Sequence, residues 1–378
     1  MESRKYFLDW LRVSAFAFLI LFHVGMLYVT WDFNLKSPRL VPALEWWMTA
    51  LGAWRLALLF FISGVASRFL IAKLGPAPFA VDRLRRLLPV ILFGMFVVIP
   101  PQTYVELLSK GVTDQSYLHF WLFSYLPADQ TLVKPLGKTM PTWDHLWFIV
   151  YLLVYTLIFA AIFGIAQRLW RKRDSSPVPL LFALLAPAAW LATANLVILD
   201  EAPLTHALVN DPGGHLKWAG MFAFGAASAG QDAFWNWLRK NRRGLAVATV
   251  LLLALQSNVN DPLWSAVSGL YAWAMICTLC GYAAQYLNRP SRLLSHLNEA
   301  VLPIYVLHQP VLLIAAYFLF PLHMPLALEG LSIAGATAIG VFAIYEGAIR
   351  PFAVTRFLFG LKTKRSPPPL SAIRADNV

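Results

Sequence analysis

The first long apolar run of the sequence, residues 8–30, contains three ionisable residues, Asp9, Arg12 and His23. An ionisable side chain inside a bilayer is energetically costly, so each of the three is a candidate for a functional site. Histidine is the only side chain whose unperturbed pKa lies near neutrality, and it can take a proton from a hydroxyl and pass it on. Arginine presents a planar fork that holds a phosphate or a carboxylate. These residue types together indicate proton transfer at His23 and anion binding at Arg12.

The spacing of these residues predicts that they share one face of a helix. Arg12 and His23 are eleven residues apart, which places them about 20° past three full turns and about 16 Å apart along the axis. Asp9 lies three residues before Arg12 and can pair with it. A separation of about 16 Å is comparable with the reach of a pantetheine arm. A simpler interpretation stays open, in which Arg12 extends to the membrane interface and His23 hydrogen-bonds a neighbouring carbonyl.

A second group of charges precedes the apolar run 87–103, and its arginines include Arg83 and Arg86. They are candidates for binding the phosphates of a nucleotide-bearing donor, although they also fit ordinary anchoring at the positive side of a membrane. Arg55 and Arg68 lie within the run 46–71, and Arg68 is nearer its inner end. Between these two arginines, Ser63 is followed by a glycine, a pair small enough for close helix contact, and Ser63 is also a candidate lining residue of the cavity around His23.

Two further histidines are candidates for the same cavity as His23. Tyr305 and His308 lie in a run bracketed by prolines, Leu302-Pro303-Ile304-Tyr305-Val306-Leu307-His308-Gln309-Pro310. Prolines free backbone carbonyls, so His308 either bonds one of them or lines the cavity. His145 and Trp147 belong to the segment Asp144-His145-Leu146-Trp147-Phe148, where Asp144 is a candidate helix cap. Trp147 also fits an interfacial aromatic belt.

Composition identifies the elements that must position these residues. Of the 378 residues, 59% are apolar and only 13% are charged, and mean hydropathy is +0.60. An ordinary soluble domain is about 45–50% apolar and about 25% charged, so the composition excludes soluble, disordered and disulfide-rich classes and predicts an all-α, polytopic membrane bundle. The net charge of +12 is better explained by lipid headgroups than by nucleic acid. Cys277 and Cys280 form a single C-x-x-C, too few ligands for structural zinc, and we expect no metal site.

About ten apolar runs are long enough, or nearly so, to cross a bilayer. They are residues 8–30, 46–71, 87–103, 145–167, 179–199, 216–230, 245–257, 263–287, 300–320 and 326–348. With the N-terminus placed in the cytoplasm, 22 of the 31 Lys and Arg residues fall in inner segments and six in outer ones. This asymmetry predicts that both termini are cytoplasmic. Residues 1–361 are expected to form one transmembrane domain, and residues 362–378 a disordered cytoplasmic tail.

Several of these motifs occur together in one known family. The opening Tyr6-Phe7-Leu8-Asp9-Trp10-Leu11-Arg12, followed by ten residues and His23, resembles the signature of the membrane acyltransferase-3 family. Further similarities follow in the family's order: Phe60-Phe61-Ile62-Ser63-Gly64, Arg83-x-x-Arg86 before Leu87-Leu88-Pro89, His145-Leu146-Trp147-Phe148, and Tyr305-Val306-Leu307-His308-Gln309-Pro310. The matching segments extend over most of the chain.

The resemblance implies a ten-helix bundle that moves an acyl group from cytoplasmic acyl-CoA to a carbohydrate hydroxyl on the other side of a bacterial inner membrane. By position, His23 would be the catalytic histidine, and Asp9 and Arg12 are further catalytic candidates on the same helix. Arg12, Arg83 and Arg86 would serve the donor, and Arg68 is a further candidate. No permanently bound cofactor is implied. Within the family the chain is most similar to members that succinylate periplasmic glucans, but the acyl group, the acceptor and the choice between monomer and homodimer stay open.

Three hypotheses follow for the activity. The first is an O-acyltransferase in which His23 acts as general base, either in direct transfer or, less simply, through an acyl-histidine. The second is a transporter or flippase for a glycan or lipid-linked intermediate, although such proteins often show repeated halves and paired broken helices. The third is a non-catalytic scaffold, which would not require Arg12 and His23 on one buried face.

Overall fold

The computed structural model describes residues 4–134, 137–169 and 179–363, and within these ranges every regular element is a helix. Eight of the described helical segments are long and apolar enough to span a membrane. They are Tyr6–Met26, Leu44–Leu74, Pro76–Ser109, Asp144–Ala166, Leu180–Ile198, Leu263–Tyr286, Arg292–Leu322 and Leu326–Ile349. The predicted all-helical membrane bundle is therefore confirmed.

The predicted count of ten spans is not confirmed, because two of the expected runs do not form long apolar helices. Residues 216–230 fall largely in α8 (Pro212–Ser228), which has only 17 residues. Residues 245–257 are the second half of α9 (Asp232–Gln256), whose first half carries four basic residues. A spanning helix needs about 20 mostly apolar residues, so charge limits α9 and length limits α8.

The other helical elements precede α8, or follow α9, in the chain. In chain order they are α1 (Tyr6–Met26), α2 (Leu44–Leu74), α3 (Pro76–Phe93), the π-helical turn η1 (Gly94–Val98), α4 (Pro100–Ser109), α5 (Tyr117–His119), η2 (Phe120–Tyr125), the 3₁₀ turn η4 (Asp144–Leu146), α6 (Trp147–Leu169), α7 (Leu180–Asp200), α10 (Leu263–Tyr286), α11 (Arg292–Leu319), η5 (Phe320–Leu322), α12 (Leu326–Ile344), η6 (Tyr345–Ile349) and α13 (Ala353–Leu358).

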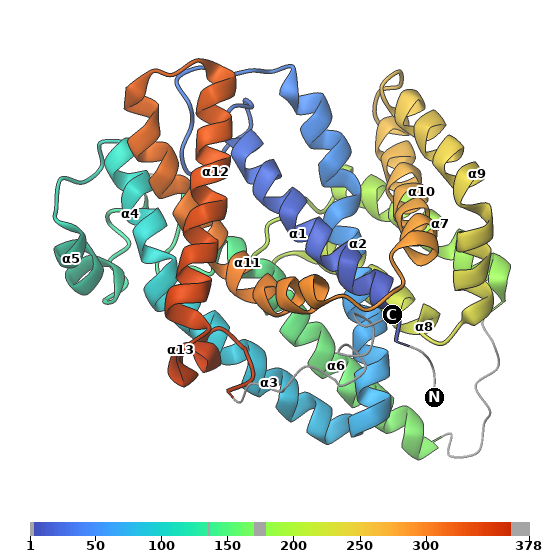
Figure 1. Ribbon diagram of the computed structural model, residues 1–378. Coiled ribbons are helices and arrows are strands. Elements are labelled where there is room, and N and C mark those ends of the chain that lie inside the picture. The colour runs from blue at the N-terminus through green and yellow to red at the C-terminus, as the bar shows by residue number, and fades with distance from the viewer. Residues whose placement is uncertain (1–3, 135–136, 170–178, 364–378) are drawn as a thin grey trace.

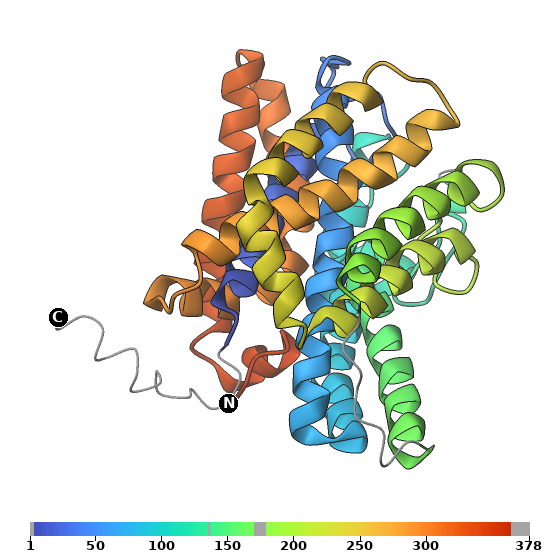
Figure 2. The same cartoon turned by 90° about the vertical axis from the view of Figure 1, so that its right-hand side faces the viewer.

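Helix α1 is central to the bundle. It packs against α2, α10, α11 and α12, and Figure 1 shows it between α7, α9 and α10 on the right and α4, α11 and α12 on the left. In the turned view of Figure 2, the yellow and orange helices α9 and α10 cross the bundle obliquely. The beginning of α1 and α13 both lie toward the lower side in the two views. Which side of the membrane this is stays a prediction, and residues 364–378 of the expected tail lie outside the described residues.

Helices α2 and α8 approach each other closely at two glycines. A Cβ added at Gly64 would lie 2.0 Å from the carbonyl oxygen of Phe222, and one added at Gly225 would lie 2.0 Å from that of Phe61. Both contacts are to backbone, which cannot move aside as a side chain can. The neighbouring Ser63 donates a hydrogen bond to Leu59 O within its own helix (2.7 Å). Gly64 thus provides the close helix contact expected from the sequence.

We expect Gly64→Ala to destabilise the protein by about 3 kcal/mol, because the added methyl group forces α2 and α8 apart in a packed interface. Thermal unfolding of the purified protein in detergent would measure the loss. Gly335→Ala, in α12, is the matched control, because a Cβ at Gly335 would meet nothing within 4 Å. Equal unfolding temperatures for the two variants would contradict the proposed packing role.

Asp211 organises the segment before α8. Its carboxylate caps the helix by accepting a hydrogen bond from Gly214 N (3.1 Å), and it also accepts bonds from Tyr151 Oη (2.6 Å) and from the amide of Thr205 (3.1 Å). Burial alone would raise the pKa of Asp211, but these hydrogen bonds lower it below its ordinary value. The ionised carboxylate therefore fixes the 204–208 segment against α6 and α8.

Asp211→Asn should lower stability by about 2 kcal/mol at neutral pH, because hydrogen bonds to a charged acceptor are lost. A lowered pKa stabilises the fold above the unfolded-state value of about 3.9, and this contribution disappears as the pH falls through the folded-state pKa. The difference between wild type and variant should therefore be complete above about pH 5 and shrink as the pH falls from there through the lowered folded-state pKa of Asp211. Unfolding temperatures measured across this range would test it, and a difference that grows toward acid would contradict the assignment.

Candidate active site

A cavity of about 930 Å³ lies between α1, α2 and α11 and is bordered by the 132–143 and 204–207 segments. Of the residues proposed from the sequence for this cavity, His23, His145, Trp147 and Tyr305 line it, whereas Ser63 is not among its lining residues in the described part of the chain. His308 is fully buried and contacts His23 from α11. The structure therefore brings together residues from α1, η4, α6 and α11 that are up to 285 positions apart in the sequence.

The hydrogen bonds around His308 assign the protons of two histidines. Nδ1 of His308 lies 2.5 Å from the carbonyl oxygen of Tyr305, so this nitrogen must donate. In neutral His308 the lone pair is then on Nε2, which lies 3.1 Å from Nδ1 of His23. His23 Nδ1–H donates to it, and the lone pair of His23 is left on Nε2. In this arrangement the Nε2 atom of His23 is free to accept a proton, while its Nδ1–H is held by His308 Nε2.

The orientation of the His23 ring is fixed from more than one side. The ring of Phe33 stacks on it with centroids 5.8 Å apart and planes 21° apart. The His308 ring centroid lies 4.9 Å from that of His23. A ring held in this way loses little further freedom when a substrate binds, which favours proton transfer at a defined atom.

His145 occupies the other side of His308. Its Nε2–H donates to Val306 O (3.0 Å), and the hydroxyl of Tyr305 donates to the His145 carbonyl oxygen. The ring centroids of His145 and His308 are 5.3 Å apart. The Nδ1 atom of His145 is buried and has no hydrogen-bond partner among the described residues. His145 therefore offers a second free lone pair at the site.

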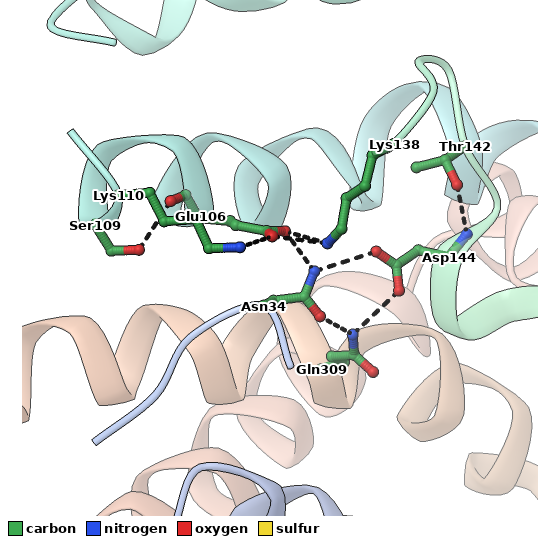
Figure 3. A network of polar contacts seen from close by, with 8 residues as sticks. All are labelled: Asn34, Glu106, Ser109, Lys110, Lys138, Thr142, Asp144 and Gln309. Atoms are coloured by element: carbon green, nitrogen blue, oxygen red, sulfur yellow. Dashed lines mark hydrogen bonds and ion pairs between the residues drawn. The ribbon is translucent and has the colours of Figure 1, made fainter. Parts of the chain in front are cut away.

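Polar residues from five segments form a network at one border of the cavity (Figure 3). Glu106 of α4 accepts hydrogen bonds from Lys110 Nζ, Lys138 Nζ and Asn34 Nδ2, each at 2.6 Å. Figure 3 shows Asn34 between Glu106 on one side and Asp144 and Gln309 on the other. Gln309 Nε2 donates to Asn34 Oδ1 (3.1 Å) and to Asp144 Oδ1 (3.3 Å). The network joins the loop after α1 to the residues adjacent to His145 and His308.

Arg12 lies at the opposite end of α1 from His23. Its Nη1 donates to Asp9 Oδ1 (3.3 Å) and to Asn298 Oδ1 of α11 (3.2 Å). The second oxygen of Asp9 accepts from Arg4 at 2.8 Å. His23 likewise contacts α11, through His308. Arg12 and His23 therefore share the face of α1 that packs on α11, as the eleven-residue spacing predicts.

The other expected donor-binding arginines divide into two groups. Arg83 and Arg86 of α3 lie close enough to Arg12 to interact with its charge. Arg83 pairs with Asp82, and Arg86 Nε donates to Gly360 O at 3.1 Å. Arg68 is elsewhere on α2, with its guanidinium 5.1 Å from the centre of the Phe163 ring. The structure thus gathers Arg12, Arg83 and Arg86 at one end and does not place Arg68 in contact with them.

Three aromatic rings line the cavity and contact one another, and one of them, Phe16, lies between His23 and Arg12 along α1. Phe16 lies edge-on to Tyr305 (5.3 Å between centroids) and to Phe148 (6.3 Å), and Phe148 lies edge-on to Tyr305 (6.0 Å). All three line the cavity, whereas Arg12 is not among the lining residues in the described part of the chain. Phe16 and Arg12 are one helical turn, about 6 Å, apart along α1. We call these three residues the aromatic barrier.

Several lining residues could not be assigned to the site from the sequence. Asn34, Glu106 and Lys138 come from segments without a periodic pattern, so nothing in the sequence places them together. Arg55 is different, because a charge inside an apolar run is itself a signal. No group of three or more His, Cys, Asp or Glu side chains that could hold a metal ion is found among the described residues.

Comparison with known proteins identifies the family. The family model for the acyltransferase-3 group, described as an acyltransferase domain, matches residues 5–346. No curated protein and no solved structure gives a significant match. The matched region runs from the start of α1 to η6 and contains every residue of the cavity and of the arginine group. Since the match covers most of its 378 residues, the chain belongs to the acyltransferase-3 family and is a membrane acyltransferase.

Proposed function

We propose that the protein is an O-acyltransferase that moves an acyl group from acyl-CoA to a carbohydrate hydroxyl, with His23 as general base. The observation that carries this proposal is the free Nε2 lone pair of His23, a half-buried histidine that lines a large cavity and is held by His308. A general base must reach the proton that it removes and must be held in one tautomer. The cavity is large enough to admit a sugar ring and an acyl thioester together.

In the proposed reaction the acyl group passes directly from the thioester to the acceptor hydroxyl. His23 Nε2 takes the proton of the acceptor hydroxyl while the hydroxyl oxygen attacks the thioester carbonyl carbon. The C–S bond then breaks, an ester is formed, and the CoA thiolate receives the proton from the imidazolium of His23. His308 Nε2 accepts the hydrogen bond from His23 Nδ1 throughout and stabilises the imidazolium. An acyl-histidine intermediate is a less simple variant of the same chemistry.

The donor is proposed to bind with its phosphates at Arg12, Arg83 and Arg86. These three arginines gather at the end of α1 away from His23, and arginine is well suited to phosphate. The separation of about 16 Å between Arg12 and His23 then matches the reach of a pantetheine arm. In this arrangement the acyl arm must pass the aromatic barrier to reach the cavity. The positive-inside pattern supports a cytoplasmic donor side in a bacterial inner membrane.

The two substrates are proposed from two segments of the sequence. The opening Tyr6-Phe7-Leu8-Asp9 and the segment His145-Leu146-Trp147-Phe148 are similar to those of glucans biosynthesis protein C, which succinylates periplasmic glucans. We therefore propose succinyl as the acyl group and a periplasmic glucan as the acceptor. Trp147 lines the cavity and would contact a sugar ring there.

The test is acceptor-dependent release of CoA by the purified protein. Succinyl-CoA and a short glucan are mixed with the protein in detergent. The free thiol of released CoA is measured, and the mass of the glucan is determined by mass spectrometry. An acyltransferase releases CoA in proportion to ester formed, with a gain of about 100 Da per succinyl group, a value from the chemistry of the ester. A transporter or flippase would release none, and that result would contradict the proposal.

A further inference from the structure

Arg55 is a buried cation without an anionic partner. It lies on α2, is 2% exposed, and its Nε and Nη1 atoms are both buried without an acceptor. Arg55 makes no hydrogen bond or ion pair with any residue in the described ranges. Its guanidinium lies 4.0 Å from the centre of the Phe22 ring. A cation–π contact of this kind offsets only part of the cost of burying a charge.

Three carboxylates line the same cavity, and each of them interacts with residues other than Arg55. Glu106 is held by Lys110 and Lys138. Asp144 accepts from Asn34 and Gln309. Asp32 also lines the cavity, and its charge acts on Lys36. None of the three is paired with Arg55, so the cavity contains a cation whose counter-ion is not supplied by the described chain.

Arg55 and His23 line one cavity from adjacent helices. Arg55 comes from α2 and His23 from α1, and both meet the same intervening residue, Phe22, which is next to His23 in the chain. The charge of Arg55 acts on both His23 and His308. An anion bound at Arg55 would therefore lie beside the place where the proposed transfer occurs.

We propose that Arg55 binds the free carboxylate of a dicarboxylic acyl group, such as succinyl, and so selects the donor. This inference rests on the proposed function. The thioester carbonyl of a succinyl group and its free carboxylate are separated by two methylene groups, so one end can lie at His23 while the other meets Arg55. A guanidinium donates hydrogen bonds to both carboxylate oxygens through its fork, and the pair is strong in apolar surroundings.

The proposal differs from a role in stabilising the oxyanion of the reaction. An oxyanion forms with every acyl donor, so a residue that serves it affects all donors alike. A carboxylate counter-ion affects only donors that carry a carboxylate. A neutral acyl group would leave the guanidinium buried and unpaired, which is the basis of discrimination against it.

The experiment compares two donors with the same four-carbon chain, succinyl-CoA and butyryl-CoA. Wild type and Arg55→Met are assayed as full-length protein with the same glucan acceptor. We expect Arg55→Met to lower kcat/KM for succinyl-CoA about 100-fold or more and to change that for butyryl-CoA less than about threefold. The variant should unfold at the same or a higher temperature than wild type, because an unpaired buried cation is removed. Equal losses with both donors, or no loss with succinyl-CoA, would overturn the proposal.

Lys217→Met is the matched control. Lys217 is another cation that lines the cavity, and its Nζ lies 5.0 Å from the centre of the Trp218 ring. We expect this variant to keep the wild-type preference between the two donors. If Lys217→Met abolishes the succinyl preference and Arg55→Met keeps it, the carboxylate site is not at Arg55.

A binding measurement separates this inference from the proposed function. Thermal unfolding is followed with each CoA ester added to His23→Ala and to the double variant that also carries Arg55→Met. Succinyl-CoA should raise the unfolding temperature of His23→Ala more than butyryl-CoA does, and the double variant should lose this difference. If wild type transfers neither acyl group, the proposed function fails, yet the binding difference still decides whether Arg55 recognises the carboxylate. Equal stabilisation by both esters would contradict it.

Discussion

Replacing His23 with alanine should lower acyl transfer by about 10³-fold or more while leaving the fold intact. A positioned general base contributes about 10² to 10⁴ in rate, and His23 is further oriented by His308 and Phe33. The loss should appear in kcat for CoA release with saturating donor and acceptor. Background thioester hydrolysis without enzyme sets the lower limit of the assay.

The control for His23→Ala is a second histidine of similar chemistry outside the cavity. His119 lies at the end of the short helix α5 and is exposed. His119→Ala should transfer at the wild-type rate, and both variants should unfold near the wild-type temperature. A folded His23→Ala protein that keeps more than about a tenth of wild-type activity would exclude His23 as general base.

His308 should be the second most sensitive position, through its effect on His23. His308→Phe removes the acceptor for His23 Nδ1–H and allows His23 to turn or change tautomer. We expect transfer to fall about 100-fold. His308→Gln restores a hydrogen-bond acceptor and should recover a large part of that loss. The ratio of the two rates, measured with the same donor and acceptor, is the readout.

The comparison of the two His308 variants separates positioning from packing. His308 is fully buried, so its replacement also affects packing. If its role were purely structural, the variant with the lower unfolding temperature would also have the lower rate of transfer. A positioning role predicts that Gln and Phe variants of similar stability differ in rate. Two folded variants with equal rates would contradict the proton assignment at His308.

The helical part of the site could be predicted because helix geometry is local. The spacing of Arg12 and His23 determines that they share a face, and in the structure both contact α11, at Asn298 and His308. The contact at Gly64 follows from residue size in the same way. Such inferences depend on a regular helix and need no knowledge of its neighbours.

The polar border of the cavity could not be predicted, because it depends on how loops fold over the bundle. Asn34, Glu106 and Gln309 meet only when three segments distant in sequence come together. The predicted count of ten spans exceeds the eight long apolar helices of the described residues for a different reason: α9 is long enough to cross, but basic residues in its first half reduce its apolar length. Arg55 was visible as a charge in an apolar run, but only the structure shows that no anion of the described chain faces it.

The aromatic barrier has a consequence for the energised membrane around it. A polar chamber that opened to both compartments at once would let ions pass and discharge the gradients on which the cell depends. Phe16, Phe148 and Tyr305 interlock edge to face, and Tyr305 is tied through its hydroxyl to the backbone of His145. If the acyl arm takes the proposed route past these rings, it must itself fill the gap that it opens, so the bound donor would keep the two compartments apart.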